Sequence, residues 1–283
     1  MIMKKILLPT DFSDNAQNAI NYALNLYKDE SCTFYLLNTY TPIIYSYDYQ
    51  MNTGGYLGEI ADVVRENSIK KLNEIEENVK EKFNNPKHHF EIVSSFNLLT
   101  DEIKDKLEQF SIDLIVMGTK GATGAKEILF GSNTIHIIQK VKCPVLAIPD
   151  GHFFEEPKEI LFPTDYKVDY STKQLESLIT IATLFDSRVH VLHVSHDVDL
   201  TKIETKNKEK LENLLLDVKQ ASYRVEDQDI PQAINEFQKS TYVQLLMMIN
   251  NKHSFFENLF FRPVINQIGF HLNIPFLVIP AKM

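Results

Sequence analysis

The chain has 283 residues, a formal net charge of −9, and 44% hydrophobic and 24% charged residues. This balance is typical of a globular protein and excludes a disordered or fibrous chain. The acidic charge argues against nucleic acid as a partner, because non-specific binding requires clustered Lys and Arg.

The apolar segments and the cysteines narrow the class of protein further. The longest apolar runs, such as residues 6–8 and 145–148, have the length of strands, so we expect no membrane segment. The N-terminal residues lack a signal-peptide pattern. Cys32 and Cys143 offer neither a disulfide framework nor a metal-binding spacing. We therefore expect a cytoplasmic protein with neither nucleic acid nor membrane as a partner.

The two halves of the chain begin and end with nearly the same phrases. The matches are KKILLPTDF (4–12) with KEILFPTDY (158–166), FYLLN (34–38) with VHVLH (189–193), and CPVLAIP (143–149) with IPFLVIP (274–280). Three matches in the same order predict a duplication. We expect one domain over residues 1–150 and a second over 151–283, joined at a turn-like linker near Gly151.

Short apolar strands alternate with amphipathic helices in each half. For the first half we expect, in chain order, a strand at 6–8, a helix capped by Ser13, a strand at 33–37, a long helix carrying Val64 and Phe83, a strand at 90–93, a helix capped by Thr100, a strand at 114–117, a helix at 132–140 and a strand at 145–148. The second half follows the same order, with Pro231 in the first turn of its third helix. Unbroken apolar strands between amphipathic helices predict an α/β fold with parallel sheets covered on both faces.

One loop in the first half has a composition that indicates a binding site. Residues 117–134, MGTKGATGAKEILFGSNT, hold four of the nine glycines, between a predicted strand and a predicted helix. Free amides in such a loop, followed by a helix that starts at Ser132, form an anion site, to which the hydroxyls of Ser132 and Thr134 can donate. The loop matches neither a Walker A motif nor the dinucleotide fingerprint. From composition alone, glycines that merely shape a tight connection remain the alternative.

The spacing of this loop resembles the nucleotide-binding signature of the universal stress protein family: Gly118, two residues, Gly121, nine residues, then Gly131 and Ser132. Residues 6–13, 113–118 and 143–146 resemble the family's first, fourth and last strands, and the resemblance spans the chain as two domains in tandem. It implies two open five-stranded parallel sheets of order 3-2-1-4-5, a Rossmann-like fold. It also implies binding of an adenine nucleotide, ATP with Mg²⁺ or Mn²⁺ held through the phosphates, and a role in the stress response.

The expected site lies where the strand order reverses. In an open α/β sheet, ligands bind beyond the carboxyl ends of the strands at this point, here between the first and fourth strands. By the resemblance, Asp11 and the end of the second strand face the adenosine, and the glycines and Ser132 hold ribose and phosphates. Lys120 is either a phosphate contact or a solvated loop residue, and Asp11 either a ligand contact or a turn residue. The expected binding residues are Pro9, Thr10, Asp11, Thr39, Met117, Gly118, Lys120, Gly121, Gly131, Ser132, Asn133 and Thr134.

The second half has lost this signature. Ile249, Lys252, Arg262 and Pro263 stand where the first half has Gly118, Gly121, Gly131 and Ser132. These side chains bring bulk where backbone would approach a phosphate, and proline donates no amide. We expect one nucleotide per chain, although Lys252 and Arg262 together could bind another anion.

Three classes of function remain after these observations. We expect an ATP-binding stress-response regulator whose second domain is a built-in dimer partner, paired through the last strands at 145–148 and 276–279; the chain could also form homo-oligomers. The alternatives are a slow ATP hydrolase and a scaffold that binds no nucleotide. The sequence contains no motif that places catalytic residues or metal ligands, which argues against an enzyme.

Overall fold

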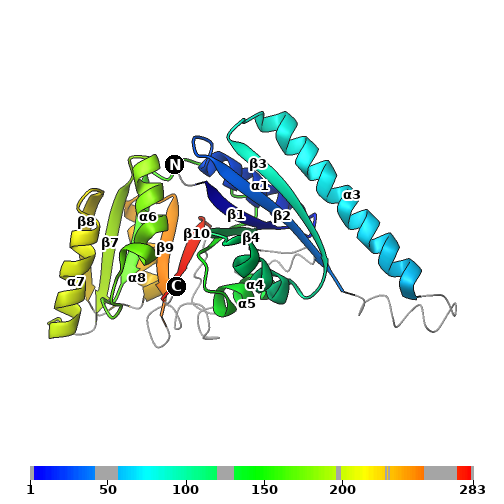
Figure 1. Ribbon diagram of the computed structural model, residues 1–283. Coiled ribbons are helices and arrows are strands. Elements are labelled where there is room, and N and C mark those ends of the chain that lie inside the picture. The colour runs from blue at the N-terminus through cyan, green and yellow to red at the C-terminus, as the bar shows by residue number, and fades with distance from the viewer. Residues whose placement is uncertain are drawn as a thin grey trace. The chain divides into compact units, whose positions relative to one another are not determined.

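The computed structural model describes residues 3–41, 57–119, 131–195, 199–226, 228, 230–251 and 273–281. Its contacts divide the chain into two compact units, the first ending at Val141 and the second starting at Lys142. Figure 1 colours the chain from its N-terminus to its C-terminus and labels most of the elements of both units. Each unit contains apolar parallel strands and amphipathic helices, as the sequence predicts.

The sheet of the first unit contains strands β1 (Lys4–Pro9), β2 (Cys32–Tyr40), β3 (His88–Phe96) and β4 (Leu114–Gly118), in the spatial order β3-β2-β1-β4. The pairings of β1 with β2, β1 with β4 and β2 with β3 are all parallel. Most side chains of β1, β2 and β4 are buried, because helices cover the sheet on both faces.

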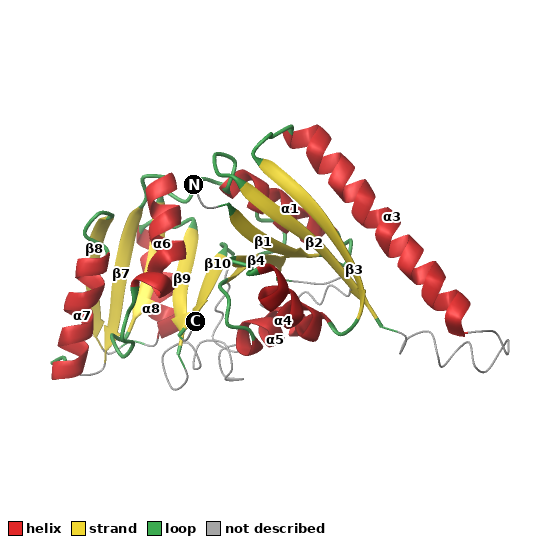
Figure 2. Ribbon diagram, in the orientation of Figure 1, coloured by secondary structure: helices red, strands yellow, loops and turns green. Residues whose placement is uncertain are grey.

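The helices of the first unit divide between the two faces of its sheet. Helices α1 (Asp14–Leu26) and α3 (Leu57–Phe83) lie on one face, and α4 (Leu99–Phe110) and α5 (Ser132–Lys140) on the other (Figure 2). The right-handed crossover rule explains the division, because the chain first moves outward from β1 to β3 and then returns to β4.

One of the two helix caps expected in this unit is confirmed and the other is wrong. Ser13 caps α1, with its hydroxyl accepting from the amide of Ala16 at 3.3 Å. Thr100 lies inside α4, which starts at Leu99. Asn97 organises this start instead, since its Oδ1 accepts from the Leu98 amide at 2.8 Å and its Nδ2 donates to the Glu102 carboxylate at 2.9 Å.

The second unit contains strands β5 (Val145–Ile148), β6 (Glu159–Thr164), β7 (Arg188–Ser195), β8 (Lys219–Glu226), β9 (Leu245–Asn250) and β10 (Phe276–Pro280). Their order is β5-β10-β9-β6-β7-β8, so the five strands of the second repeat have the expected order 3-2-1-4-5. Helices α6 (Thr172–Leu184) and α7 (Lys202–Leu214) lie on one face and α8 (Ile230–Ser240) on the other (Figure 2). Pro231 lies in the first turn of α8, as predicted.

The last strands of the two repeats meet inside the second unit. β5 pairs with β10 in antiparallel register, with Leu277 opposite Leu146 and Val278 opposite Val145. β10 also pairs with β9 on its other side. An apolar strand that would otherwise be a sheet edge is thereby hydrogen-bonded on both sides, which removes a site for aggregation.

Each unit buries a histidine whose charging would oppose folding. His88, in β3, lies with its Nε2 3.0 Å from the Tyr27 carbonyl oxygen, and His193, in β7, lies with its Nδ1 3.1 Å from the Thr164 carbonyl oxygen. Burial is the main cause that lowers the pKa of each ring below its ordinary value. Both rings are therefore neutral in the folded chain at neutral pH.

These two histidines predict a loss of stability in mild acid. As the pH falls through the ordinary histidine range, near about 6.5, the unfolded chain binds protons that the folded chain does not. The free energy of unfolding should be nearly constant above that range and should decrease between about pH 7 and about pH 5.5. Urea denaturation should show a shallower decrease for His88→Gln/His193→Asn, whereas a variant of the exposed His89, His89→Asn, should behave as the unaltered chain. Equal slopes in all three proteins would contradict the prediction.

Candidate functional site

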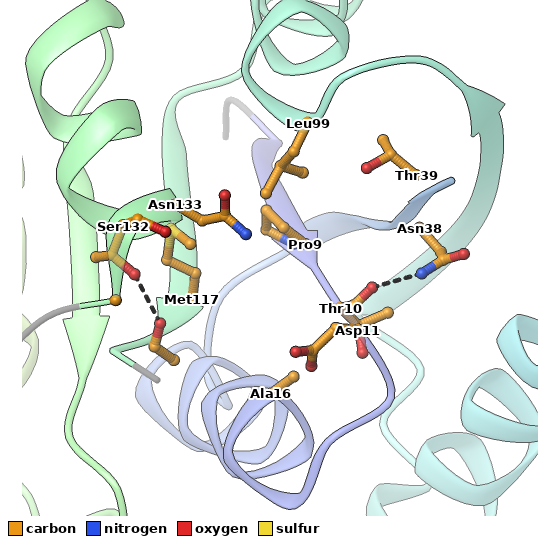
Figure 3. Close-up of a pocket in the computed structure, with 13 residues that line it drawn as sticks. Pro9, Thr10, Asp11, Ala16, Asn38, Thr39, Leu99, Met117, Ser132 and Asn133 are labelled. Carbon is orange, nitrogen blue, oxygen red and sulfur yellow. Dashed lines mark hydrogen bonds between the residues drawn. The ribbon is translucent and has the colours of Figure 1, made fainter. Parts of the chain in front are cut away.

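The first unit contains a cavity at the carboxyl ends of its strands. It has a volume of about 210 Å³ and is lined by Pro9, Thr10, Asp11, Ala16, Asn38, Thr39, Leu99, Met117, Gly118, Gly131, Ser132, Asn133 and Thr134. Figure 3 shows Thr10, Asp11 and Asn38 on one side and Ser132 and Asn133 on the other. The cavity lies at the point where the strand order reverses, since β1 has β2 on one side and β4 on the other.

Most of the residues expected from the sequence come together around this cavity. Lys120 and Gly121 lie outside the described residues, and the ten other expected residues all line it. Ala16, Asn38 and Leu99 also line it and were not expected. Asn38 precedes Thr39 at the end of β2, and its amide side chain directly after the apolar run of residues 34–37 is the signal that could have identified it.

The turn after β1 is held rigidly by Thr10. The Thr10 amide donates to the Leu37 carbonyl at 2.8 Å, and the Thr10 carbonyl accepts from the Asn38 side chain at 2.8 Å. The Thr10 hydroxyl oxygen accepts from the Phe12 amide at 3.0 Å. Phe12 takes a left-handed conformation with φ of 66°, which is uncommon for a bulky residue and shows that these bonds fix the turn.

Asp11 has a structural role in addition to its position at the cavity. Its Oδ1 accepts from the Ser13 amide at 3.1 Å and from the Ser13 hydroxyl at 2.6 Å. The side chain is exposed and lines the cavity at the same time. Asp11 is therefore a turn residue whose carboxylate also faces the space that a ligand would occupy.

Gly118 is required by the close approach of α1 to the end of β4. A Cβ atom at this position would lie 2.0 Å from Oδ1 and 2.7 Å from Cγ of the buried Asn15. The Gly118 carbonyl also accepts from the Thr134 hydroxyl at 3.1 Å, which ties β4 to the first turn of α5. Gly118 thus allows a tight connection between β4 and its neighbours, as the alternative interpretation of the loop expects. The Thr134 hydroxyl donates to the Gly118 carbonyl rather than to a ligand.

The start of α5 presents amides to the cavity. Gly131 is the N-cap, and its own amide donates to the Thr119 carbonyl at 2.5 Å. Glycine has no side chain that could cap a helix, so the first amides of α5, at Ser132 and Asn133, have no intrahelical acceptor. The positive end of the helix dipole lies at the same place. This end of the cavity is built to receive negative charge.

The second unit repeats the turn chemistry around different side chains. The Thr164 hydroxyl oxygen accepts from the Tyr166 amide at 3.0 Å, and Tyr166 is left-handed with φ of 56°. His193 takes the place of Asn38, and the Tyr166 ring stacks on it at 4.6 Å between centroids. Ile249 is buried at the position of Gly118, while Lys252, Arg262 and Pro263 lie outside the described residues.

The described part of the chain offers neither a membrane span nor a metal cluster. None of its helices is long and apolar enough to cross a membrane. No cluster of three or more His, Cys, Asp or Glu side chains among those residues could hold a metal ion.

These features define a doubly wound α/β protein with a cavity at the switch point of its first sheet. The model of the universal stress protein family matches residues 3–149 and 157–280. The chain belongs to the universal stress protein family, with two family domains in tandem.

Known proteins support the same conclusion. The chain is 31% identical over 151 residues to universal stress protein MJ0531 of Methanocaldococcus jannaschii, a match that covers 52% of this chain and 82% of that protein. It is 26% identical over 157 residues to universal stress protein YxiE of Bacillus subtilis, covering 52% of this chain and 99% of that protein. The crystal structure of a universal stress protein from Archaeoglobus fulgidus has the same fold, with a TM-score of 0.69 and 19% identity over 98% of this chain and 96% of that one.

The contact between Gly118 and Asn15 predicts a specific pattern of stability. Gly118→Ala should lower the free energy of unfolding by about 1–3 kcal/mol, because the added methyl group overlaps the Asn15 side chain. Asn15→Ala removes the overlapping atoms, so the double variant should lose less stability than the sum of the single variants in a denaturation cycle. Additive losses would mean that the two residues do not meet.

Proposed function

We propose that the first unit binds one adenine nucleotide, ATP, in this cavity and that the chain acts as a nucleotide-binding regulator of the stress response. One observation carries the proposal. The start of α5, which has no side-chain cap, and the turn that bears Asp11 lie on opposite sides of one cavity. The family signature of the loop and the resemblance of both repeats add to it. In this proposal the second domain is a partner for the first and binds no nucleotide.

The phosphates are assigned to the start of α5. The chain has a net charge of −9. At the start of α5, backbone amides and the helix dipole can provide the positive potential that phosphates require, in place of cationic side chains. Ser132 and Asn133 supply two such amides, and the exposed Ser132 adds a hydroxyl. Mg²⁺ or Mn²⁺ would enter with the phosphates, since these oxygens are its natural ligands.

The adenosine is assigned to the opposite side. Pro9 and Leu99 offer apolar surface for a base, and Asp11 offers a carboxylate that can accept from ribose hydroxyls. Thr39 at the end of β2 closes this side. Apolar surface for the base beside convergent polar groups that fix the orientation of the ligand is a usual arrangement in small-molecule sites.

A binding role fits the described cavity better than catalysis. Asp11 is the one ionisable side chain among the described lining residues, and its carboxylate is assigned to the ribose hydroxyls rather than to the phosphates. A general base must lie within hydrogen-bond reach of the water that attacks the phosphate. We therefore propose little or no turnover, with slow hydrolysis of a positioned Mg²⁺–ATP as the alternative.

The variant Ser132→Pro tests the phosphate assignment with little risk to folding. Ser132 is the first residue of α5, where proline is favoured, and the ψ of 154° at Gly131 suits a following proline. The variant loses one amide that would donate to a phosphate, a charged hydrogen bond worth about 1.5–3 kcal/mol. Titration calorimetry should therefore find ATP binding weaker by about tenfold or more.

Ser132→Ala is the matched control because it removes the hydroxyl and keeps the amide. It should bind ATP more tightly than Ser132→Pro. If a folded Ser132→Pro protein binds ATP as tightly as the unaltered chain, the start of α5 is not the phosphate site.

A further inference from the structure

A chain of three hydrogen bonds, two of them buried, runs from the turn at the cavity to the half-buried Ser94. Asn38 Nδ2 donates to the Thr10 carbonyl, Ser68 Oγ donates to Asn38 Oδ1, and Ser94 Oγ donates to Ser68 Oγ, each at 2.8 Å. Asn38 and Ser68 are buried, with 8% and 3% of their surface exposed. Figure 3 shows the link between Asn38 and Thr10 beside the cavity. We call Ser94, Ser68 and Asn38 the serine relay.

The direction of every bond in the serine relay is fixed from its inner end. A carbonyl only accepts, so Asn38 must turn its NH₂ group to Thr10 and its oxygen away from it. That oxygen only accepts, so Ser68 must donate to it, and Ser94 must then donate to Ser68. Loss of the Ser68 hydroxyl would leave a buried amide oxygen without its donor and free Asn38 to turn.

Ser68 is also the first buried residue among the described side chains of α3. Among the described side chains of this helix, those before Ser68 are exposed or half-buried, and Val63 is 65% exposed. The buried positions that follow are Leu72, Ile75 and Val79, on the same face of the helix. Among its described side chains, the part of α3 at residues 61–71 is therefore buried only through the polar contact of Ser68, whereas the part from Leu72 onward has apolar packing. Few buried apolar contacts mark a segment of low local stability.

Among its described residues, the second unit holds the corresponding carbonyl, that of Thr164, without such a relay. His193 Nδ1 lies 3.1 Å from the Thr164 carbonyl oxygen, and among the described residues its buried Nε2 has no hydrogen-bond partner. Asn207 of α7 instead donates directly to the Tyr166 carbonyl at 2.8 Å. In the described residues of the first repeat, a link thus runs from α3 through β2 to the turn beside the cavity.

We propose that Ser68 is a positioning residue for the nucleotide site, and that through Asn38 it couples the seating of α3 to the affinity of the cavity. This inference rests on the proposed function. The relay sets the Thr10 carbonyl and hence the position of Asp11 opposite the start of α5. Because such coupling is reciprocal, bound nucleotide stabilises the N-terminal half of α3, and any partner that lifts this half releases the nucleotide. Nucleotide binding can thus be regulated through α3, on the outer surface of the unit.

The test compares Ser68→Ala with Val79→Ala, which weakens the same helix about three turns away and leaves the relay intact. We expect Ser68→Ala to weaken ATP binding about five- to tenfold in titration calorimetry. Val79→Ala should change it less than about twofold while lowering the stability at least as much. Ser94→Ala should have a smaller effect than Ser68→Ala, because Asn38 keeps its donor.

Hydrogen exchange with and without ATP tests the reciprocal effect. In the unaltered chain, ATP should slow exchange of the amides around residues 61–72, and in Ser68→Ala this protection should be lost. Equal ATP affinity for Ser68→Ala and Val79→Ala, or protection that persists in Ser68→Ala, overturns the inference and leaves the proposed function standing. Absence of ATP binding by the unaltered chain overturns the proposed function and the inference with it.

Discussion

The cavity of the first unit depends on the parallel pairing of β1 with β2 on one side and β4 on the other. This pairing brings the turn at Thr10 and the end of β4 to the same edge of the sheet, while the connections from β1 and β4 depart to opposite faces. Gly118 permits this geometry at the end of β4, because a Cβ atom there would overlap the Asn15 side chain of α1. Everything proposed for the site follows from this geometry.

The two repeats show how much of this design is turn chemistry and how much is the side chains placed on it. Both use a threonine hydroxyl to accept from an aromatic residue in a left-handed conformation, at Phe12 and at Tyr166. They differ in what packs beneath the turn, where a hydrogen-bonded Asn38 in the first repeat is replaced by His193 under the Tyr166 ring in the second. The two repeats thus share the backbone of the turn after their first strands and differ in the side chains placed around it.

The sequence predicts the parts of the structure that depend on local patterns. Apolar strands, the Ser13 cap and the repeat order are periodic or local signals, and the structure confirms them. The start of α4 could not be predicted in this way, because Asn97 organises it through a contact with Glu102 five residues later. Leu99 as a lining residue and the contact of Gly118 with Asn15 require the packed sheet, since no sequence spacing encodes them.

The stoichiometry of nucleotide binding tests the central claim most directly. In equilibrium dialysis with labelled ATP, the intact chain should saturate near one nucleotide per chain, because the switch point of the second repeat has Ile249 where the first has Gly118. Two equivalent sites per chain, or no saturable binding, would contradict the account.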